Sequence, residues 1–460
     1  MQYFLSLIFG LITAAAFEPV AFWPAALIGL GGWYYLLVTA NLRSRIYISY
    51  LYGLTLLLTV QNWTGIYVGN TPWIALCIVQ AIFFIVPAYF VSKKQRYNQI
   101  SFATSYVLVE LLLRTVPFTG FGWSRISFTQ ADSPLSALYP LGGVVLVAFI
   151  SAAVAATRTL ITGLVLIAII LFSSVLISPV TDLGKVRIAL IQGGVTNLGL
   201  DFNSTPQEVF KRHLSQTAKS VTTKQVDLIV WPENAVDIDI NTTPGIASQV
   251  SDLSKFLQTP ILIGGVTRSL NGPQNQSILF NPDKQQVYTK RYLTPFGEYL
   301  PLRNLSTKFS KYADEITDFS AGKNDLVFQI NDLKFQTQIC YEIINDSFRD
   351  QVKSDFLIVQ TNNATFGDTA QLDQELNIAK IRALETGREV AYVSTTGVTS
   401  FIDNKGQIRN SVPRFIPATL IDEVNIVEGQ TYTQRYGKYL EGLSIIMLLV
   451  ILFARRRVRR

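Results

Sequence analysis

The chain has 460 residues, of which 49% are hydrophobic and only 15% are charged, and its mean hydropathy is +0.29. Soluble domains carry about a quarter charged residues, so this composition excludes a chain that lies wholly in water. The net charge of +7 includes five arginines in the terminal segment Arg455–Arg460, directly after an apolar run. Basic residues in that position are typical of membrane topology signals and not of a nucleic-acid-binding surface. We therefore expect no nucleic acid among the partners.

Apolar runs dominate the first 180 residues, in which Glu18, Glu110 and Asp132 are the only acidic residues. A membrane span has to cross a hydrocarbon core of about 30 Å. Runs that can cross it, or nearly so, lie at Tyr3–Phe17, Phe22–Ala40, Ile46–Val60, Pro72–Val91, Phe102–Val116, Leu141–Ala156, Leu160–Ile177 and Leu443–Ala454. We predict a multi-pass α-helical membrane domain over residues 1–180, with about seven helices. A C-terminal transmembrane helix with a basic tail is predicted over residues 439–460.

The charges of the connecting segments predict the orientation in the membrane. Basic residues follow the second, fourth, sixth and last runs, whereas the segment between the third and fourth runs, 61–71, has none. Apart from the terminal arginines, these basic residues are Arg43, Arg45, Lys93, Lys94, Arg96 and Arg158. Because positively charged segments stay on the cytoplasmic side, we expect both termini in the cytoplasm. The region between the seventh and eighth runs is then expected outside it.

Two features of the membrane half stand apart from this pattern. Glu110 is an ionisable group within an apolar run, which makes it a functional candidate by default. Arg114 follows one turn later, and we interpret the two as an ion pair on one helix face. The segment 117–143 is rich in glycine, proline and aromatic residues. Its composition alone favours an interfacial loop with an aromatic belt.

The region 184–438 has an ordinary soluble composition, in which short β-rich runs alternate with helical stretches. Strands are predicted at Val186–Gln192, Leu228–Trp231, Ile261–Val266, Gln276–Phe280, Lys334–Cys340, Phe356–Thr361, Ala391–Thr395 and Thr399–Ile402. Several are continuously apolar, as expected of strands that are covered on both faces. Helical periodicity covers Thr205–Val221 and Asp373–Arg388. The alternation predicts a layered α/β domain with functional groups at the strand ends.

The chain contains two cysteines, Cys77 and Cys340, and one histidine, His213. A disulfide is not expected, because Cys77 lies in an apolar run and Cys340 ends a predicted soluble strand. The spacing of these residues does not match a zinc site, so no metal is expected. His213 lies in a polar stretch and is expected to be solvated, which leaves a serine–histidine hydrolase with little support.

Three clusters place reactive residue types just after predicted strands. They are VWPEN with Glu233, YTKRYLTPFGEYLP with Lys290, and ICYE with Cys340. Taken singly, a carboxylate or a lysine is usually solvated, and a lone cysteine is usually a small buried hydrophobic group. Taken together, they supply a thiol nucleophile, a base to activate it and a cation for the oxyanion of a tetrahedral intermediate. The combination predicts acyl transfer through a cysteine.

At these clusters the sequence resembles the nitrilase (carbon-nitrogen hydrolase) superfamily, whose members use a Glu–Lys–Cys triad in an αββα sandwich. More narrowly, it resembles the apolipoprotein N-acyltransferase family over essentially the whole chain. The motifs that carry this likeness are PFTGFGW at Pro117–Trp123, TPFGEYLP, CYE, Thr361–Asp368, and AKIRALETG at Ala379–Gly387. The order of the parts agrees as well: helices first, then a nitrilase-like domain over residues 184–438, then one final helix.

The resemblance implies a two-step reaction in which Cys340 takes a fatty acyl group from a phospholipid as a thioester. The acyl group then passes to the N-terminal α-amino group of the diacylglyceryl-cysteine of an apolipoprotein. Glu233 is the implied base and Lys290 the implied oxyanion donor. Supporting roles are implied for Glu298, Glu342, Tyr341 and Asn275. We further expect no cofactor, a monomer, and a place in the bacterial inner membrane with the catalytic domain on the periplasmic side.

Two other functions remain open at this stage. A membrane-tethered nitrilase-type amidase or lipid hydrolase would use the same triad, with water in place of the amine. A transporter with an accessory domain would need ionisable residues near the membrane midplane or paired broken helices. The membrane half offers only Glu110 and no internal repeat, which disfavours the transporter.

Overall fold

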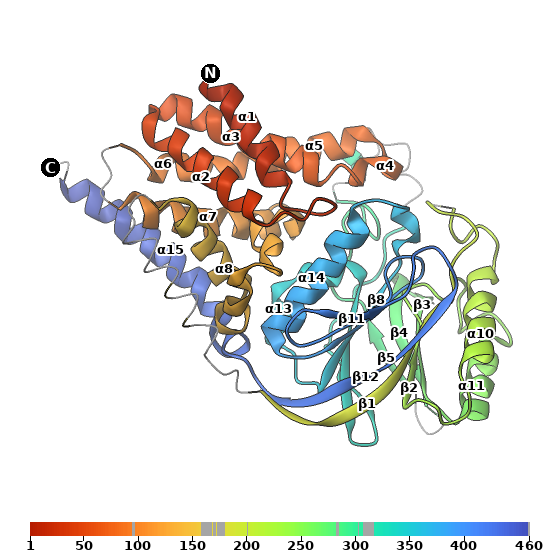
Figure 1. Ribbon diagram of the computed structural model, residues 1–460. Coiled ribbons are helices and arrows are strands. Elements are labelled where there is room, and N and C mark those ends of the chain that lie inside the picture. Colours follow the sequence, from red (N-terminus) through yellow and green to blue (C-terminus); the bar gives the residue numbers. More distant parts are fainter. Residues whose placement is uncertain are drawn as a thin grey trace. The chain divides into compact units, whose positions relative to one another are not determined.

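A computed structural model of the chain, drawn in Figure 1, describes residues 1–93, 97–157, 168, 172, 180–199, 201–281, 285–301, 303–306 and 317–458. The chain forms two compact units. The first unit combines Met1–Pro179 with Thr431–Arg460, and the second is Val180–Gln430. The last helix therefore belongs with the N-terminal helices, although a whole domain separates them in the sequence.

The first unit is α-helical. Its longer helices are α1 Gln2–Ala14, α2 Pro24–Thr39, α3 Leu42–Val60, α5 Asn70–Ala81, α7 Asn98–Thr115, α8 Tyr139–Ala155 and α15 Tyr432–Val458. Short helices are α4 Thr64–Val68, η1 Ile82–Ile85, α6 Val86–Phe90, η2 Gly122–Ser124, η3 Ile126–Gln130 and η4 Pro134–Leu138. Each predicted apolar run coincides with one or more of these helices, except Leu160–Ile177, which lies outside the described residues apart from two isolated positions.

Three helical segments of the described residues are long and apolar enough to cross a membrane. They are Asn70–Phe90, Pro134–Ala155 and Tyr432–Ala454, while Gln2–Ala14 and Pro24–Thr39 are shorter apolar helices. Large apolar side chains such as Ile28, Ile78 and Phe453 are exposed on them. Exposed apolar side chains on apolar helices are what lipid contact requires, so the finding agrees with a membrane domain.

Inside the first unit, aromatic side chains pack between helices. The ring of Trp33 on α2 stacks on Tyr52 of α3 at 4.4 Å between centroids. Glu110 of α7 accepts hydrogen bonds from the backbone N–H of Ser127 at 3.0 Å and from its hydroxyl at 2.6 Å. Arg114 forms an ion pair with Glu441 of α15. Arg114 therefore has a partner on the last helix, which the pairing predicted within α7 did not include.

The segment after α7 differs from the interfacial loop predicted for it. Residues from Gly122 to Ala131 are almost all buried and form η2 and η3. The Trp123 ring packs on Trp63 at 5.0 Å, and the amide of Gln61 donates to the Ser124 hydroxyl at 3.0 Å. Glu110 of α7 accepts from the Ser127 N–H and the Tyr139 hydroxyl of α8 donates to the Ser127 carbonyl, so side chains of neighbouring helices satisfy part of the backbone of this segment. The interfacial loop predicted for this segment is thus a buried segment with two short helices.

The second unit is built on two six-stranded sheets. The first has the order β12-β1-β2-β3-β4-β5, with β1 Val180–Gln192, β2 Leu228–Val230, β3 Ile261–Ser269, β4 Gly272–Phe280, β5 Gln286–Thr289 and β12 Ala418–Gly429. The second has the order β11-β10-β9-β8-β7-β6, with β6 Phe328–Ile330, β7 Leu333–Ile339, β8 Phe356–Thr361, β9 Val390–Ser394, β10 Ser400–Ile402 and β11 Ile408–Ser411. Strands β1–β3 are parallel to one another, as are β7–β9.

Strand periodicity explains the layers. Alternate residues of one strand point to opposite faces, so Ile188 and Leu190 of β1 enter the core between the sheets, whereas Ala189 and Ile191 face the outer helices. Helices α10 Glu208–Ser220 and α11 Ile246–Leu257 cover that outer face (Figure 1). Helices α13 Asp346–Asp350 and α14 Gln371–Thr386 lie on the second sheet. The predicted αββα sandwich is confirmed.

All eight predicted strands coincide with strands of the structure, although β1 begins at Val180 and β4 at Gly272, ahead of their predicted starts. The sequence pattern missed β5, β6, β11, β12 and α11. Strand β11 is exposed throughout and β5 has four residues, so neither presents a clear apolar alternation. Helix α14 ends at Gly387, whose φ of 64° is left-handed, as the stop signal in the sequence predicted.

The prediction that His213 is solvated is wrong. Its side chain is fully buried on the inner face of α10, where its ring lies 5.8 Å from that of Trp231. Helix α10 is polar outside and apolar inside, and the basic neighbours Lys211 and Arg212 in the sequence concealed that face. The Nδ1–H of His213 donates to the Val209 carbonyl at 2.8 Å.

Candidate active site

The three predicted catalytic residues follow strands of both sheets. Glu233 lies two residues beyond Trp231 after β2, Lys290 directly follows β5, and Cys340 directly follows β7. Because the strand ends meet at one edge of the sandwich, side chains far apart in the sequence become neighbours. The ammonium Nζ of Lys290 lies 3.5 Å from Oε1 of Glu233, and both groups interact electrostatically with the thiol of Cys340.

A glycine in β3 makes room for Glu233. A Cβ atom at Gly264 would lie 2.3 Å from the Pro232 carbonyl oxygen and 2.7 Å from the Cα of Glu233. Both distances are shorter than real Cβ contacts, and the obstructing atoms belong to backbone. Asn234, the next residue, has a φ of 55° in the left-handed region, where a non-glycine backbone is strained. The turn is thus fitted to present the carboxylate.

Lys290 is buried among carboxylates. Its Nζ lies 2.9 Å from Oε2 of Glu298 in addition to its contact with Glu233. The exposed fraction of its side chain is 1%. Burial alone lowers the pKa of a lysine, but the charges of Glu298 and Glu233 outweigh it and raise the pKa of Lys290. The side chain therefore stays positively charged, as an oxyanion donor must.

Asn275 connects the two carboxylates. Its Nδ2 donates to Oε1 of Glu233 at 2.7 Å and to Oε1 of Glu298 at 2.8 Å. The sequence placed Asn275 before a strand, whereas it lies inside β4 and is buried. The second oxygen of Glu298 accepts from the backbone N–H of Thr294 at 2.8 Å. The Asn275 amide and the Thr294 N–H thus keep both carboxylates beside Lys290.

The carboxylate of Glu233 is suited to take a proton. Its Oε2 accepts from the backbone N–H of Asn362 at 2.8 Å. Burial raises the pKa of Glu233, Lys290 lowers it and Glu298 raises it, with a net shift upward. A carboxylate with a raised pKa is a stronger base than a solvated one.

Cys340 occupies a strained position. Strand β7 ends at Ile339, one residue earlier than predicted, and Cys340 opens the turn η6, Cys340–Ile344, with a φ of 48°. The residue as a whole is partly exposed. Burial raises the pKa of that thiol, as do the carboxylates of Glu233 and Glu375, whereas Lys290 and a side-chain hydrogen bond with Thr361 lower it. A cysteine thiol has to lose its proton before it can act as a nucleophile, and Glu233 is a carboxylate that interacts electrostatically with this thiol.

Glu342 braces the backbone on both sides of the site. Its Oε2 accepts from the N–H of Ile339 at 2.9 Å, just before the nucleophile. Its Oε1 accepts from the N–H of Arg291 at 2.7 Å, just after Lys290. Glu342 thus ties the segments of Lys290 and Cys340 together, whereas Glu298 contacts the lysine directly. Tyr341 lies buried beside the nucleophile in η6.

Several buried polar residues around the site escaped the sequence reading. Glu375 on α14, with Thr361 and Asn363 nearby, interacts with Cys340 and Glu233. Every residue of its helix except Asp373 is buried, so no amphipathic pattern marked Glu375. Within the described ranges, no group of three or more His, Cys, Asp or Glu residues could hold a metal ion.

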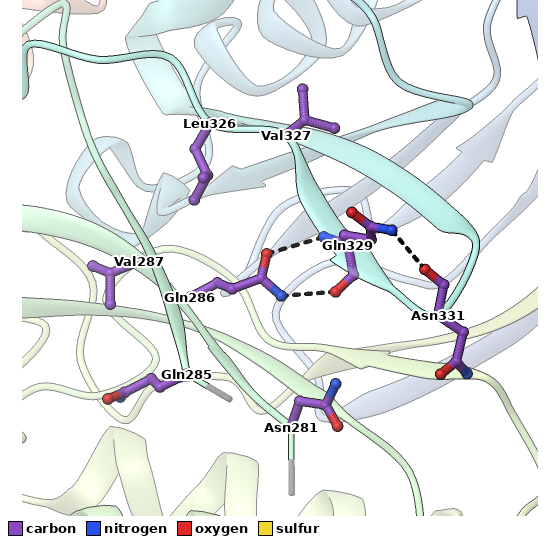
Figure 2. A pocket seen from close by; sticks show the side chains of 8 residues that line it. All are labelled: Asn281, Gln285, Gln286, Val287, Leu326, Val327, Gln329 and Asn331. Carbon is purple, nitrogen blue, oxygen red and sulfur yellow. Dashed lines mark hydrogen bonds between the residues drawn. The ribbon is translucent and has the colours of Figure 1, made fainter. Parts of the chain in front are cut away.

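A hollow elsewhere on the second unit is not part of this site. Figure 2 shows it between β5 and β6, where the Gln286 side chain donates to the Gln329 carbonyl at 2.7 Å and accepts from the Gln329 N–H at 3.0 Å. This pair of hydrogen bonds joins the edge strands of the two sheets. Its lining residues are Asn281, Gln285, Gln286, Val287, Leu326, Val327, Gln329 and Asn331. They include no member of the Glu233, Lys290 and Cys340 cluster.

Comparison with known proteins places the chain in a class. Residues 187–434 match the carbon-nitrogen hydrolase family, and residues 9–157 match the apolipoprotein N-acyltransferase N-terminal domain. The fold and the site therefore define a membrane-associated enzyme of the carbon-nitrogen hydrolase class. Within that class, the chain belongs to the apolipoprotein N-acyltransferase family.

The relatives extend along the whole chain. An apolipoprotein N-acyltransferase of Wigglesworthia glossinidia brevipalpis is 27% identical, and the match covers 98% of each chain. One of Mycolicibacterium smegmatis is 29% identical over 98% of this chain and 86% of the relative. Among solved structures, a carbon-nitrogen hydrolase superfamily protein of Xanthomonas campestris is 17% identical with a TM-score of 0.41, covering 56% of this chain and 96% of its own.

Proposed function

We propose that this protein transfers a fatty acyl chain from a phospholipid to the N-terminal α-amino group of the diacylglyceryl-cysteine of apolipoproteins. The observation that carries the proposal is the buried cluster of Glu233, Lys290 and Cys340. It occurs in a chain whose matched relatives are apolipoprotein N-acyltransferases from end to end. Both substrates are lipids, which accounts for a membrane unit on a catalytic domain.

In the first step, Glu233 takes the thiol proton and the sulfur of Cys340 attacks the carbonyl carbon of a phospholipid ester, proposed to be at the sn-1 position. The ammonium of Lys290 stabilises the oxyanion. When the intermediate collapses, the carbon–oxygen bond breaks and the leaving alkoxide takes the proton from Glu233. Lysophospholipid departs, and the acyl chain remains on Cys340 as a thioester.

In the second step, the free α-amine of the apolipoprotein attacks the thioester carbonyl. Glu233 removes a proton from the attacking nitrogen, and Lys290 again stabilises the oxyanion. The carbon–sulfur bond breaks, and the thiolate recovers its proton from Glu233. The products are an amide at the lipoprotein N-terminus and the free enzyme. Asn275 and Glu298 hold the base and the cation in place through both steps, while Glu342 and Tyr341 support the nucleophile.

For the cellular setting we propose a monomer in the bacterial inner membrane, with the catalytic domain in the periplasm and both termini in the cytoplasm. The proposed parts are the membrane domain 1–180, the catalytic domain 184–438 and the final helix 439–460. The compact units divide at Pro179 and Gln430, and α15 begins at Tyr432, a few residues before the proposed start of the last part.

The test uses purified full-length protein, a phospholipid and a synthetic diacylglyceryl lipopeptide, with products followed by mass spectrometry. The wild type is expected to add one acyl chain to the lipopeptide and to release lysophospholipid in equal amount. Cys340→Ala is expected to lose both products, because no thioester forms. Cys77→Ala, which removes the other thiol from α5, serves as the matched control and is expected to keep both.

Two outcomes would contradict the proposal. Free fatty acid with an unmodified lipopeptide would indicate a hydrolase that uses the same triad. Acyl transfer that survives in Cys340→Ala would exclude the thioester step. Intact mass analysis of the wild type with phospholipid alone adds an independent check, since the acyl group is expected on Cys340 and not on Cys77.

A further inference from the structure

A buried carboxyl group behind the nucleophile has no part in the mechanism above. Glu375 lies on α14 with no exposed surface. Its Oε2 accepts three hydrogen bonds, from the Thr361 hydroxyl at 3.0 Å, the Asn363 amide at 2.8 Å and the Gln371 amide at 3.0 Å. Thr361 in turn lies at the Cys340 thiol and hydrogen-bonds with it. The carboxyl group thus orients a hydroxyl that touches the nucleophile.

The other oxygen of Glu375 is bound differently. Within the described part of the chain, neither Oε1 of Glu375 nor the hydroxyl of Tyr392 has a hydrogen-bond partner of ordinary geometry, and both atoms are buried. The two groups nevertheless interact with each other. An ionised carboxylate shares its charge between both oxygens, so a buried oxygen without a donor is costly. A proton on Oε1 would remove that charge and turn the atom into a donor toward Tyr392.

The charges that face Glu375 favour the same state. Glu233, Cys340 and Tyr392 of β9 interact electrostatically with Glu375, and each is neutral or negative. The positive charge of Lys290 is paired with Glu233 and Glu298. Charged residues on the elements that pack against α14 have other partners: Asp346 pairs with Arg382, Arg349 pairs with Asp350 and Glu385, and Glu342 binds backbone N–H groups.

Ionisation would therefore place a second negative charge beside the base and the thiolate. Burial raises the pKa of Glu375, and the charge of Glu233 raises it further, against its three hydrogen bonds. Near the thiol, an ionised Glu375 would also raise the pKa of Cys340 and so oppose formation of the nucleophile.

We propose that Glu375 is a positioning residue that is protonated in the working enzyme, with the proton on Oε1 toward Tyr392. Its Oε2 then fixes the Thr361 hydroxyl at the Cys340 sulfur without bringing a charge to the site. This assignment rests on the proposed function of Cys340 as nucleophile. Loss of the Glu375 proton at alkaline pH switches the site off.

Two substitutions separate the neutral from the ionised form. Glu375→Gln keeps an acceptor at the place of Oε2 and puts a donor at the place of Oε1, so it imitates the protonated acid and not the carboxylate. Glu375→Leu removes the whole network. Asp373→Asn is the matched control, because it makes the same chemical change two residues earlier on α14, where Asp373 is partly exposed and pairs with Arg414.

Infrared difference spectroscopy of the full-length protein reads the proton directly and needs no substrate. At neutral pH, the carbonyl stretch of a protonated carboxylic acid is expected in the wild type and in Asp373→Asn. The spectrum of Glu375→Gln is expected to lack the contribution of one such group. Identical spectra for wild type and Glu375→Gln would overturn the protonated state, whether or not the protein transfers acyl chains.

The kinetic test compares pH profiles of acyl transfer and of Cys340 alkylation by iodoacetamide, with the modified residue identified by mass spectrometry. At neutral pH, Glu375→Leu is expected to lose about 100-fold in kcat, as for a misplaced nucleophile, while Glu375→Gln stays within about fivefold of wild type. At alkaline pH, kcat of the wild type is expected to decline, whereas kcat of Glu375→Gln is not.

Either of two kinetic results would refute the positioning role. One is a Glu375→Leu variant with wild-type kcat and an unchanged alkylation profile. The other is the same alkaline decline in wild type and Glu375→Gln. If no variant transfers acyl chains but Cys340 alkylation still depends on Glu375 as stated, the proposed function fails and the assignment of Glu375 stands.

Discussion

The amide of Asn275 reduces the repulsion between two buried carboxylates at the site. Glu233 and Glu298 both lie against Lys290, so two negative charges share one positive charge in a buried place. A single –NH₂ group that donates to one oxygen of each carboxylate lowers their mutual repulsion and fixes their separation. Hydrogen bonds to charged groups are stronger than neutral ones, at about 1.5–3 kcal/mol. Asn275 therefore helps to determine which protonation state the base can adopt.

Changing Asn275 to aspartate replaces this donor with a third carboxylate. Asn275→Asp is expected to lower kcat/KM by about 100-fold at neutral pH, since removing a single preorganised donor from a catalytic site costs about that much. Part of the activity is expected to return as the pH falls, because the added carboxyl then takes a proton and can donate again. The measurement is kcat/KM for acyl transfer as a function of pH.

Asn271→Asp is the matched control, an exposed position on the same β3–β4 hairpin. It is expected to behave as wild type at every pH. Wild-type kinetics in Asn275→Asp would show that the bridge contributes nothing to the base.

At the scale of elements, α10 is held on the first sheet through a buried histidine. His213 fills the space left by Gly193, where a Cβ atom would lie 2.6 Å from its Nδ1. Next to it, the indole N–H of Trp231 donates to the Thr217 hydroxyl at 2.9 Å. Burial lowers the pKa of His213 to about 4, although its bond to the Val209 carbonyl opposes this. The ring is therefore neutral when the helix is docked.

This burial predicts how stability depends on pH. The unfolded state takes up a proton on the histidine below its ordinary pKa of about 6.5, whereas the folded state does so only near pH 4. Protonation of the unfolded state therefore leaves the free energy of unfolding unchanged above about pH 6.5. As the pH falls toward 4, it lowers that free energy by about 3 kcal/mol. In His213→Leu, which has no ionisable group at this position, the free energy of unfolding is expected to depend less on pH between 6.5 and 4.

Hydrogen exchange measured by mass spectrometry on peptides that cover α10 checks the prediction. In the wild type, exchange of α10 is expected to accelerate between pH 6.5 and 4, after correction for the intrinsic effect of pH on exchange, and in His213→Leu it is not. Lys211→Gln, exposed on the same helix, is the control and is expected to follow the wild type. Equal acid sensitivity of wild type and His213→Leu would contradict the assignment.

At the scale of the whole molecule, the last helix belongs to the N-terminal helices and not to the domain that precedes it. Arg114 of α7 pairs with Glu441 of α15, and the Thr433 hydroxyl of α15 bonds to the Tyr139 carbonyl of α8. Polar contacts of this kind hold helices together where the surroundings are apolar. The catalytic domain is thus connected at both of its ends to one helical unit.

The proposed topology leads to a prediction for fusion reporters in a Gram-negative host. Green fluorescent protein fused after Arg460 is expected to fluoresce, and alkaline phosphatase at the same position is expected to be inactive, because the terminal arginines keep that end in the cytoplasm. Alkaline phosphatase fused after Gln430 is expected to be active, since it follows the catalytic domain. The reversed pattern would place the catalytic domain in the cytoplasm and contradict the proposal.

The amino-acid sequence by itself determined the division of the chain and the fold class. Hydropathy, charge and strand periodicity are local properties, so the membrane half, eight strands and the order of the parts could be read without coordinates. The three candidate residues could be selected because each follows a predicted strand directly or nearly so. A reactive residue type at a strand end is a candidate for a functional site. The interfacial loop and the solvated His213 were misjudged, because composition does not reveal which face of a segment is covered.

Only the tertiary structure decided how the site works. Asn275 bridges Glu233 across 42 positions of sequence, and Glu342 binds the backbone of Arg291 across 51. Glu375 gains its meaning from Thr361, Tyr392 and Cys340, which come from different elements. Hydrogen bonds and buried charges depend on distance in space and on exclusion of water, and neither is encoded within a short stretch of chain. Residue types can therefore name a nucleophile, but their packing determines which groups carry its protons.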